Sequence, residues 1–326
     1  MPDVLLIGGT RFIGRHTVRE FREHGYDVTL ANRGTHPNPF ADDPAIDHVT
    51  CDRREDEQLR AVRDAVDPDV VIDLVAYYPR DVRVATEVFA DCEAYVFVSS
   101  GAAYGESAVP KREGETALAS CTSAEATDDS HATYGKRKAE GDREVFAAAE
   151  DGVRAMSVRP TVVYGPHDYT ERLDYWLHRV DAHDRIVVPG DGGSLQHLVS
   201  VADVASALRI VAEDGTAGEA YNVADRDAPP LGRVIDLLAD ACDTEVEQVY
   251  ASGRELSPDL APEDFPLYNE RPHLLATGKL YDLGWEWTPH AEALEPTVAD
   301  HRESDRDGSD VGPRRDVEAD ILDRLG

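Results

Sequence analysis

A tyrosine and a lysine four residues apart, Tyr134 and Lys138, are the side chains best suited to move a proton. Residues at this spacing share one face of a helix, and the sequence predicts a helix over about 132–150. A tyrosine titrates near pH 10, so it acts as a base near neutrality only if its pKa falls by about 3 units. A neighbouring ammonium group favours the phenolate and lowers that pKa.

Ser100 is a third candidate, because it follows a predicted strand. The apolar run at 95–98 predicts a short buried strand that ends at Ser99-Ser100. Parallel sheets bind ligands at the carboxyl ends of their strands. A hydroxyl at Ser100 could donate to a substrate oxygen while Tyr134 exchanges the proton, or it could only cap the strand end.

A glycine-rich turn lies between a predicted strand at 4–7 and a helix that ends at Gly25. Backbone N–H groups and the positive end of a helix bind the pyrophosphate of a dinucleotide at such a turn, and glycines let the backbone approach the phosphates. The residues of the turn are Gly8, Gly9, Thr10, Arg11, Phe12, Ile13 and Gly14. We expect all seven to belong to a cofactor site.

The end of the second predicted strand, 28–31, indicates which cofactor is bound. An acidic residue there binds the ribose of NAD, whereas an arginine accommodates the 2′-phosphate of NADP. This chain has Asn32-Arg33, which favours NADP over NAD, although Arg33 could also be a solvated turn residue. Asp52, after a third strand expected at 49–51, could bind the adenine amino group or be a plain turn aspartate.

Strands that alternate with helices predict an α/β fold, with a Rossmann doubly wound parallel sheet and a smaller C-terminal substrate-binding region. A fourth strand is expected at 70–75, where Val75 and Ala76 join Lys138 in the cofactor site. The expected regions are a nucleotide-binding domain at 1–165 with about 199–225, a substrate-binding region at 166–198 and 226–300, and a charged tail at 301–326. We expect this tail to be mobile up to a short helix near 317–325.

Charge limits the partners of this 326-residue chain: 33 basic against 65 acidic residues give a net charge of −32. Such a surface repels phosphate backbones and anionic membranes, so we expect a small-molecule substrate and neither nucleic acid nor membrane. The composition is rich in aspartate and poor in lysine, which resembles proteins of salt-in halophilic archaea. Four scattered cysteines and no converging ligands predict no metal site, and the N-terminus does not read as a signal peptide, so a cytoplasmic protein is expected.

Five motifs in order resemble a known family. They are Val98–Gly105 (S-S-x-x-x-Y-G), Tyr134-x-x-x-Lys138, Val158–Pro166 (R-P-x-x-V-Y-G-P), Leu198–Ala205 (F-V-H-V-x-D-V-A) and Gly278–Trp285 (S-K-x-x-x-x-L-G-W). They are similar to the extended short-chain dehydrogenase/reductase superfamily in its NAD-dependent epimerase/dehydratase branch. The G-G-T-R-F-I-G turn, with Arg11 in place of the middle glycine, resembles an atypical subgroup that includes chloroplast stem-loop RNA-binding proteins.

The resemblance implies catalytic roles for three residues. Tyr134 would be the acid/base, Lys138 would hold the nicotinamide ribose and lower the pKa of the tyrosine, and Ser100 would bind the reacting oxygen. The implied activity is an NAD(P)-dependent epimerase or dehydratase acting on a nucleotide sugar or a related polar compound, with a homodimer as the family's expected assembly.

The segment before the F-V-H-V motif departs from that of many nucleotide-sugar epimerases. Nucleotide-sugar epimerases often carry an arginine before the F-V-H-V motif, where this chain has Leu195-Gln196-His197. We expect Gln196 to contact the substrate there, and Arg172 or Arg271 could compensate for the missing arginine. Two alternatives therefore stay open. One is a simple NADP-dependent reductase of a smaller ketone or alcohol, and the other is a non-catalytic RNA-binding or regulatory protein.

Overall fold

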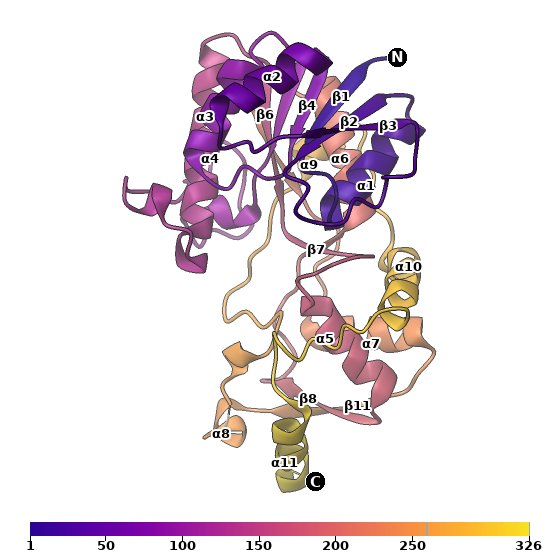
Figure 1. Cartoon of the computed structure of the whole chain (residues 1–326). Coiled ribbons are helices and arrows are strands. Elements are labelled where there is room, and N and C mark those ends of the chain that lie inside the picture. The colour runs from indigo at the N-terminus through magenta and orange to yellow at the C-terminus, as the bar shows by residue number, and fades with distance from the viewer. Residues whose placement is uncertain (259, 326) are drawn as a thin grey trace. The chain divides into compact units, whose positions relative to one another are not determined.

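The computed structural model of the chain describes residues 1–258 and 260–325 and divides into two compact units (Figure 1). The first unit contains residues 1–163, 201–224 and 275–287. The second contains residues 164–200, 225–274 and 288–326, of which 259 and 326 are not described. The chain therefore passes between the units several times.

A seven-stranded parallel sheet forms the centre of the first unit, in the order β10-β6-β5-β4-β1-β2-β3. The strands are β1 (Asp3–Ile7), β2 (Asp27–Asn32), β3 (Ile46–Thr50), β4 (Val70–Asp73), β5 (Ala94–Val98), β6 (Ala155–Pro160) and β10 (Ala220–Val223). Every neighbouring pair is parallel, with Val4 opposite both Val28 and Val70. This order is that of a doubly wound nucleotide-binding sheet and confirms the predicted fold class.

Helices cover both faces of the sheet. On one face α1 (Phe12–Glu23) contacts α6 (Val201–Asp214), and on the other α3 (Pro79–Val88) contacts both α2 (Asp56–Val66) and α4 (Tyr134–Glu150) (Figure 1). Three 3-10 turns, η1 (Gly101–Ala103), η2 (Glu125–Thr127) and η3 (His131–Thr133), and the short helix α9 (Gly278–Tyr281) complete the unit. Apolar strands covered on both faces explain why β4 and β5 are buried along their whole length.

Two predicted strands have a boundary that differs from the structure by more than one residue. The third strand is 46–50, not 49–51, because its first residues are mostly exposed and polar and give little apolar signal. The fourth ends at Asp73, not at 75, since the Asp73 carboxylate accepts the Val75 backbone N–H (3.2 Å) and turns the chain out of the ladder.

Residues 275–287 belong to the first unit and not, as expected, to the C-terminal region. Lys279 donates to the carbonyl of Ala220 in β10 (2.9 Å). The indole of Trp285 donates to the carbonyl of Asp203 in α6 (3.0 Å). These long-range contacts attach the segment to the nucleotide-binding sheet.

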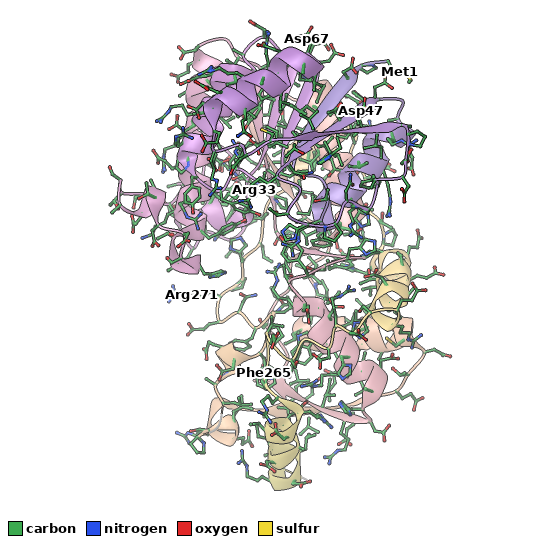
Figure 2. The ribbon with its side chains drawn as sticks, in the orientation of Figure 1. Met1, Arg33, Asp47, Asp67, Phe265 and Arg271 are labelled. Atoms are coloured by element: carbon green, nitrogen blue, oxygen red, sulfur yellow. The ribbon has the colours of Figure 1, made fainter. Side chains whose placement is uncertain are left out.

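The second unit is built around aromatic side chains. Its elements are α5 (Arg172–Ala182), β8 (Arg185–Pro189), β9 (Leu198–Ser200), α7 (Leu231–Cys242), β11 (Glu247–Ala251), α8 (Gly253–Leu256), η4 (Pro262–Asp264), α10 (His290–Arg302) and α11 (Arg315–Leu325), while β7 (Val162–Tyr164) crosses the boundary. Strands β8 and β11 pair in parallel. Trp176 of α5 stacks on Phe265 (6.1 Å between centroids), which Figure 2 labels.

The charged tail is packed into the second unit, which corrects the expectation of a mobile segment. Arg306 pairs with Asp174 (3.0 Å), and Gly308 lies so close to Tyr175 that no side chain would fit. The final helix begins at Arg315 and buries Glu318. Ion pairs between acidic side chains and arginines, together with the contact of Gly308 on Tyr175, thus hold the C-terminal segment, although its charged composition predicts that it is solvated.

In the described part of the chain, no helix is long and apolar enough to cross a membrane. Within the same residues, no group of three or more His, Cys, Asp or Glu side chains could hold a metal ion.

Candidate functional site

The glycine turn forms a narrow backbone cradle between β1 and α1. Gly8 and Gly9 have φ angles of +113° and +92°, which L side chains rarely adopt. A Cβ at Gly14 would lie 2.5 Å from the Cα of Gly9, so the first turn of α1 packs directly on the loop. Of the remaining turn residues, Thr10 and Phe12 are buried, Ile13 is half-buried and Arg11 is exposed. A turn whose glycines leave the backbone accessible before a helix N-terminus fits a pyrophosphate.

Asn32 supports this cradle from the end of β2. Its side-chain amide donates to the carbonyl of Gly8 (3.3 Å), and its Oδ1 accepts the N–H of Gly34 (2.9 Å). His48 contacts the same oxygen (3.1 Å). The next residue, Arg33, is exposed and labelled in Figure 2. Asn32 therefore shapes the turn, whereas the side chain of Arg33 is open to solvent.

Asp52 follows β3 and is held as a carboxylate. Arg54 donates to both of its oxygens (3.0 and 2.6 Å), and these bonds lower the pKa of Asp52 to about 2. The backbone N–H of Asp52 donates to Gln58 (2.9 Å). Asp52 is therefore an ionised acceptor near neutral pH, as binding of an amino group requires.

Lys138 is buried with its ammonium at the ends of two strands. Its Nζ donates to the carbonyls of Ala76 (3.0 Å) and Val98 (2.8 Å), which follow and end β4 and β5. The ring centroids of Phe97 and Tyr134 lie 4.7 and 5.8 Å from the same nitrogen. Burial lowers the pKa of Lys138 to about 8, against the attraction of nearby carboxylates. The lysine thus joins the fourth and fifth strands to the helix that carries Tyr134.

Tyr134 and Ser100 are brought together by a close helix contact. Tyr134 is the first residue of α4, and a Cβ on the next residue, Gly135, would collide with the carbonyl of Ala102. The Ser100 hydroxyl accepts the N–H of Ala102 (3.2 Å), so Ser100 does cap the turn after β5, and its own O–H is still a donor. The structure thus places Ser100, Tyr134 and Lys138 around the carboxyl ends of β4 and β5. The cofactor residue Val75 lies half-buried beside the buried Ala76.

Other motif residues stabilise the fold rather than face a ligand. The buried Arg159 donates to Asp142 (2.8 Å) and to the hydroxyl of Tyr104 (2.9 Å). Tyr104 in turn donates to Asn222 (2.8 Å). This network joins the Y-G and R-P motifs to α4 and β10, which gives both motifs a structural role.

The expected substrate residues all lie in the second unit. Arg172 is half-buried and donates to Thr170 (3.3 Å). Gln196 is buried, and its amide donates to the carbonyl of Ser194 (2.9 Å). Arg271 is exposed and labelled in Figure 2. Of the three side chains, that of Gln196 is thus the most buried, and it is held by a hydrogen bond within the second unit.

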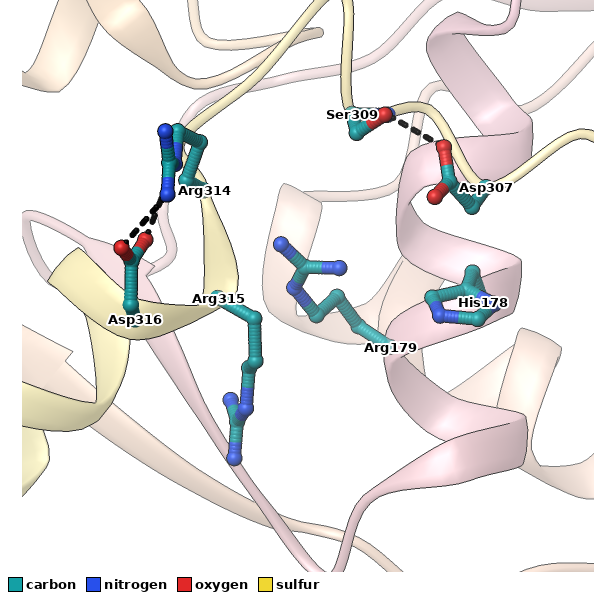
Figure 3. Close-up of a pocket in the computed structure, with 7 residues that line it drawn as sticks. All are labelled: His178, Arg179, Asp307, Ser309, Arg314, Arg315 and Asp316. Atoms are coloured by element: carbon teal, nitrogen blue, oxygen red, sulfur yellow. Dashed lines mark hydrogen bonds and ion pairs between the residues drawn. The ribbon is translucent and has the colours of Figure 1, made fainter.

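A cavity of about 360 Å³ in the second unit has balanced charges (Figure 3). It is lined by His178, Arg179, Asp307, Ser309, Arg314, Arg315 and Asp316. Arg314 pairs with Asp316 (2.7 Å), and Arg179 and Arg315 share the carboxylate of Glu318 (2.7 and 2.8 Å). With Asp307 the three arginines meet three carboxylates, so the cavity favours neither anions nor cations.

A buried charge cluster behind the site is not predicted from the sequence. Arg53 donates to both carboxylate oxygens of Asp73 (2.6 and 2.5 Å) and to the carbonyl of Asp81 (2.5 Å). Tyr95 also donates to Asp73 (2.9 Å). Two signals could have shown it: an aspartate at the end of an otherwise apolar strand, and an arginine three residues after the end of the preceding strand.

Comparison with known proteins shows the family to which this chain belongs. The sequence model of the NAD-dependent epimerase/dehydratase family matches residues 4–224. This chain belongs to that family. The match includes the glycine turn, Ser100, Tyr134 and Lys138, and it confirms the resemblance drawn from the motifs. Family members are enzymes of the short-chain dehydrogenase/reductase type.

Two curated relatives have names that indicate different functions. The chloroplast stem-loop binding protein of 41 kDa b of Arabidopsis thaliana is 29% identical over 232 residues, which are 68% of this chain and 58% of that protein. The low-salt glycan biosynthesis protein Agl12 of Haloferax volcanii is 26% identical over 248 residues, 68% of this chain and 76% of that protein. The chain thus spans little more than half of the first relative.

Solved structures share the fold along nearly the whole chain. The dTDP-glucose 4,6-dehydratase of Bacillus anthracis, in complex with NAD, has a TM-score of 0.74 at 19% identity, covering 94% of this chain and 98% of that one. The UDP-glucose 4-epimerase of Thermotoga maritima, with UDP-glucose, has a TM-score of 0.73 at 22% identity, covering 92% and 99%. At these identities the likeness is one of fold.

Proposed function

We propose that this chain is an NAD(P)-dependent epimerase/dehydratase-type oxidoreductase acting on a nucleotide sugar or a related polar carbonyl or hydroxyl compound. One observation carries the proposal: the Lys138 ammonium, buried between the Ala76 and Val98 carbonyls, lies 5.8 Å from the ring of Tyr134. Family membership and the nucleotide-sugar ligand or substrate named for several relatives support it.

Each of the three side chains has a defined task. Tyr134 Oη takes a proton from the substrate hydroxyl or returns it to the carbonyl oxygen. The Lys138 ammonium favours the phenolate form of Tyr134, and its one N–H not donated to Ala76 or Val98 can bind a ribose hydroxyl. Ser100 Oγ donates to the reacting oxygen, which fixes the substrate against Tyr134.

The cofactor residues fit a dinucleotide because Gly8 and Gly9 leave the backbone accessible beside the N-terminus of α1, and Gly14 lets that helix pack closely on the turn. When bound, NAD(P) supplies the acceptor and donor of a hydride. Arg33 is exposed at the end of β2, where it would meet a 2′-phosphate, so NADP is favoured over NAD. Asp52 would accept the adenine amino group, and Val75, Ala76 and Lys138 would line the nicotinamide side.

The substrate contacts of Arg172, Gln196 and Arg271 stay predictions. A panel of single alanine variants, scored by KM against kcat, would test them: a residue that binds substrate equally in its ground and transition states raises KM and leaves kcat unchanged.

The function is tested with purified protein in molar KCl, a panel of UDP- and dTDP-sugars, and both cofactors. Tyr134→Phe should bind cofactor as the wild type does and lose turnover by about 100-fold or more. Wild-type turnover in this variant would overturn the mechanism. Product analysis separates the alternatives, because epimerisation consumes no net cofactor, whereas the simple reductase reaction consumes NADPH stoichiometrically.

RNA binding without catalysis is the second candidate, and the similarity to the chloroplast stem-loop binding protein favours it. The net charge of −32 opposes it, since counterion release drives such binding only where cationic side chains meet phosphates. A gel shift with a stem-loop RNA at working salt would decide: a specific shift together with no binding of either cofactor would replace the enzymatic proposal.

A further inference from the structure

The loop between β4 and α3 carries the carbonyl that receives Lys138, and carboxylates hold this loop on both sides of that carbonyl. Asp73 accepts the N–H of Val75 (3.2 Å) before Ala76. Asp81 accepts the N–H groups of Tyr77 and Tyr78 after it (3.2 Å each). The position of the Ala76 carbonyl therefore depends on both aspartates.

Arg53 joins these two aspartates. Its guanidinium donates to both oxygens of Asp73 and to the main-chain carbonyl of Asp81, and it lies 3.8 Å from the Asp81 carboxylate. The side chain of Arg53 is 9% exposed, and those of Asp73 and Asp81 are 0% and 7% exposed. Charges so far removed from water interact strongly and need partners.

Two buried anions, Asp73 and Asp81, therefore pair with Arg53 and hold the loop whose carbonyl receives the second buried cation, Lys138. Around Lys138 the other charged or titratable groups are Asp142, which pairs with Arg159, together with Arg137, Tyr77, Tyr134 and, through Asp73, Tyr95. Asp73 favours the charged form of Lys138, and Arg53 opposes it.

We propose that Arg53 and Asp73 are positioning residues for the proposed catalytic lysine: together they fix the Ala76 carbonyl that receives Lys138 and balance the charge beside its ammonium. The inference rests on the proposed function only in giving Lys138 a catalytic role. The arginine follows β3, the aspartate ends β4, and the lysine lies on α4, so the pair acts through the fold and not by touching a substrate.

The test reads the charge of Lys138 directly. The chain contains only four lysines, Lys111, Lys136, Lys138 and Lys279, so a protein labelled with ¹³C at lysine Cε gives four signals, and Lys138→Met assigns the one in question. The titration uses the full-length protein without cofactor or substrate in molar KCl.

Opposite shifts are expected from the two partners. Arg53→Met removes a cation that opposes the charged form of Lys138 and leaves the attraction of Asp73 uncompensated, so it should raise the pKa of Lys138 by about 1 unit. Asp73→Asn keeps the side-chain shape but leaves Arg53 facing the ammonium, and should lower that pKa by about 1 unit. The double variant should return towards the wild type. Arg179→Met, which removes an equally buried and paired arginine from the second unit, should leave the Lys138 signal unchanged.

A purely structural role would predict no shift, or shifts of the same sign, and either result would overturn the inference. Asp73→Asn decides the question even if Arg53→Met fails to fold. Calorimetric titration with NAD⁺ and NADP⁺ is the second readout, and both single variants should bind the preferred cofactor at least about 10-fold more weakly. Opposite shifts of Lys138 without cofactor binding by the wild type would retain the inference and reject the proposed function.

Discussion

Lys138 donates a hydrogen bond of 2.8 Å from its Nζ to the carbonyl oxygen of Val98, the last residue of β5. The bond fixes an ammonium group inside the protein, at the edge of the sheet where a ligand would bind. Burial there lowers the pKa of Lys138 from 10.5 to about 8, so the folded protein carries the cost of a buried charge at neutral pH.

This cost predicts a dependence of stability on pH. Below about pH 8 Lys138 is charged in both the folded and the unfolded state, so burial of the charge lowers the unfolding free energy by its full amount. Between about pH 8 and 10.5 the folded protein has lost this proton and the unfolded chain still holds it, so stability rises with pH. Relative to Lys138→Met, the wild type should gain about 3 kcal/mol of unfolding free energy across this range. Denaturant unfolding at several pH values measures it.

The matched control for that experiment is Lys136→Met. Lys136 is partly exposed and pairs with Glu125, and its removal leaves Lys138 in place, so Lys136→Met should keep the wild-type rise in unfolding free energy between pH 8 and 10.5. If the unfolding free energies of the wild type and Lys138→Met changed with pH in the same way, the pKa of Lys138 would not be lowered in the folded state.

Gly14→Ala should disrupt the cofactor cradle. The new Cβ would lie 2.5 Å from the Cα of Gly9 and 2.8 Å from its carbonyl carbon, and backbone atoms cannot move aside as a side chain can. We expect a loss of about 2 kcal/mol in stability and loss of cofactor binding by calorimetry. Gly278→Ala is the control, because its Cβ would meet nothing within 4 Å, and it should stay within about 0.5 kcal/mol of the wild type. If Gly14→Ala and Gly278→Ala had the same stability and bound cofactor equally well, the glycine turn would not be part of the cofactor site.

Arg33→Ala tests the choice of cofactor. If the exposed guanidinium binds the 2′-phosphate, its removal should weaken NADP⁺ binding by about 10-fold or more, the value of a charge-assisted hydrogen bond. NAD⁺, which lacks that phosphate, should bind as before. Equal losses for both cofactors would mean that Arg33 supports the turn and does not select NADP.

The sequence predicts most of the nucleotide-binding sheet because strands such as β1, β4 and β5 show a local pattern, short apolar runs that alternate with helices. The pair Tyr134 and Lys138 was predictable for the same reason, since residues four apart on a helix necessarily share a face. Ser100 followed from its position after β5. All three depend on near neighbours in the chain.

The remaining features depend on contacts between distant segments. Arg53 and Asp73 reveal a cluster only once β3 and β4 are placed in one sheet. Lys279 and Trp285 bring residues 275–287 to the first unit through Ala220 and Asp203, contacts that no local pattern encodes. The expected roles of Arg172, Gln196 and Arg271 came from the resemblance alone and stay predictions.

Salt should stabilise this protein. A net charge of −32 at pH 7 opposes compaction through mutual repulsion, and molar KCl screens charges over a few ångström. We expect the melting temperature to rise markedly between dilute buffer and molar KCl, with loss of structure at the lowest salt. Equal melting temperatures at both salt concentrations would contradict the halophilic interpretation of the composition.

The C-terminal helix provides a last prediction, because it closes a buried ion pair in the second unit. Glu318 is fully buried and accepts hydrogen bonds from Arg179 (2.7 Å) and from the backbone N–H of Val187 (2.8 Å). Glu318→Gln keeps the shape but leaves the charge of Arg179, whose side chain is 3% exposed, without its carboxylate. We expect a loss of about 3–5 kcal/mol in unfolding free energy, as for other broken buried pairs.

Asp316→Asn, two residues earlier, is the control for this helix. Asp316 pairs with Arg314, but both side chains are largely exposed, and such pairs contribute at most about 1 kcal/mol. Denaturant unfolding of the full-length variants in molar KCl compares the two. A large loss in Glu318→Gln alone would establish that the charged C-terminal segment is part of the folded second unit. Similar small losses in both variants would mean that α11 contributes little to its stability.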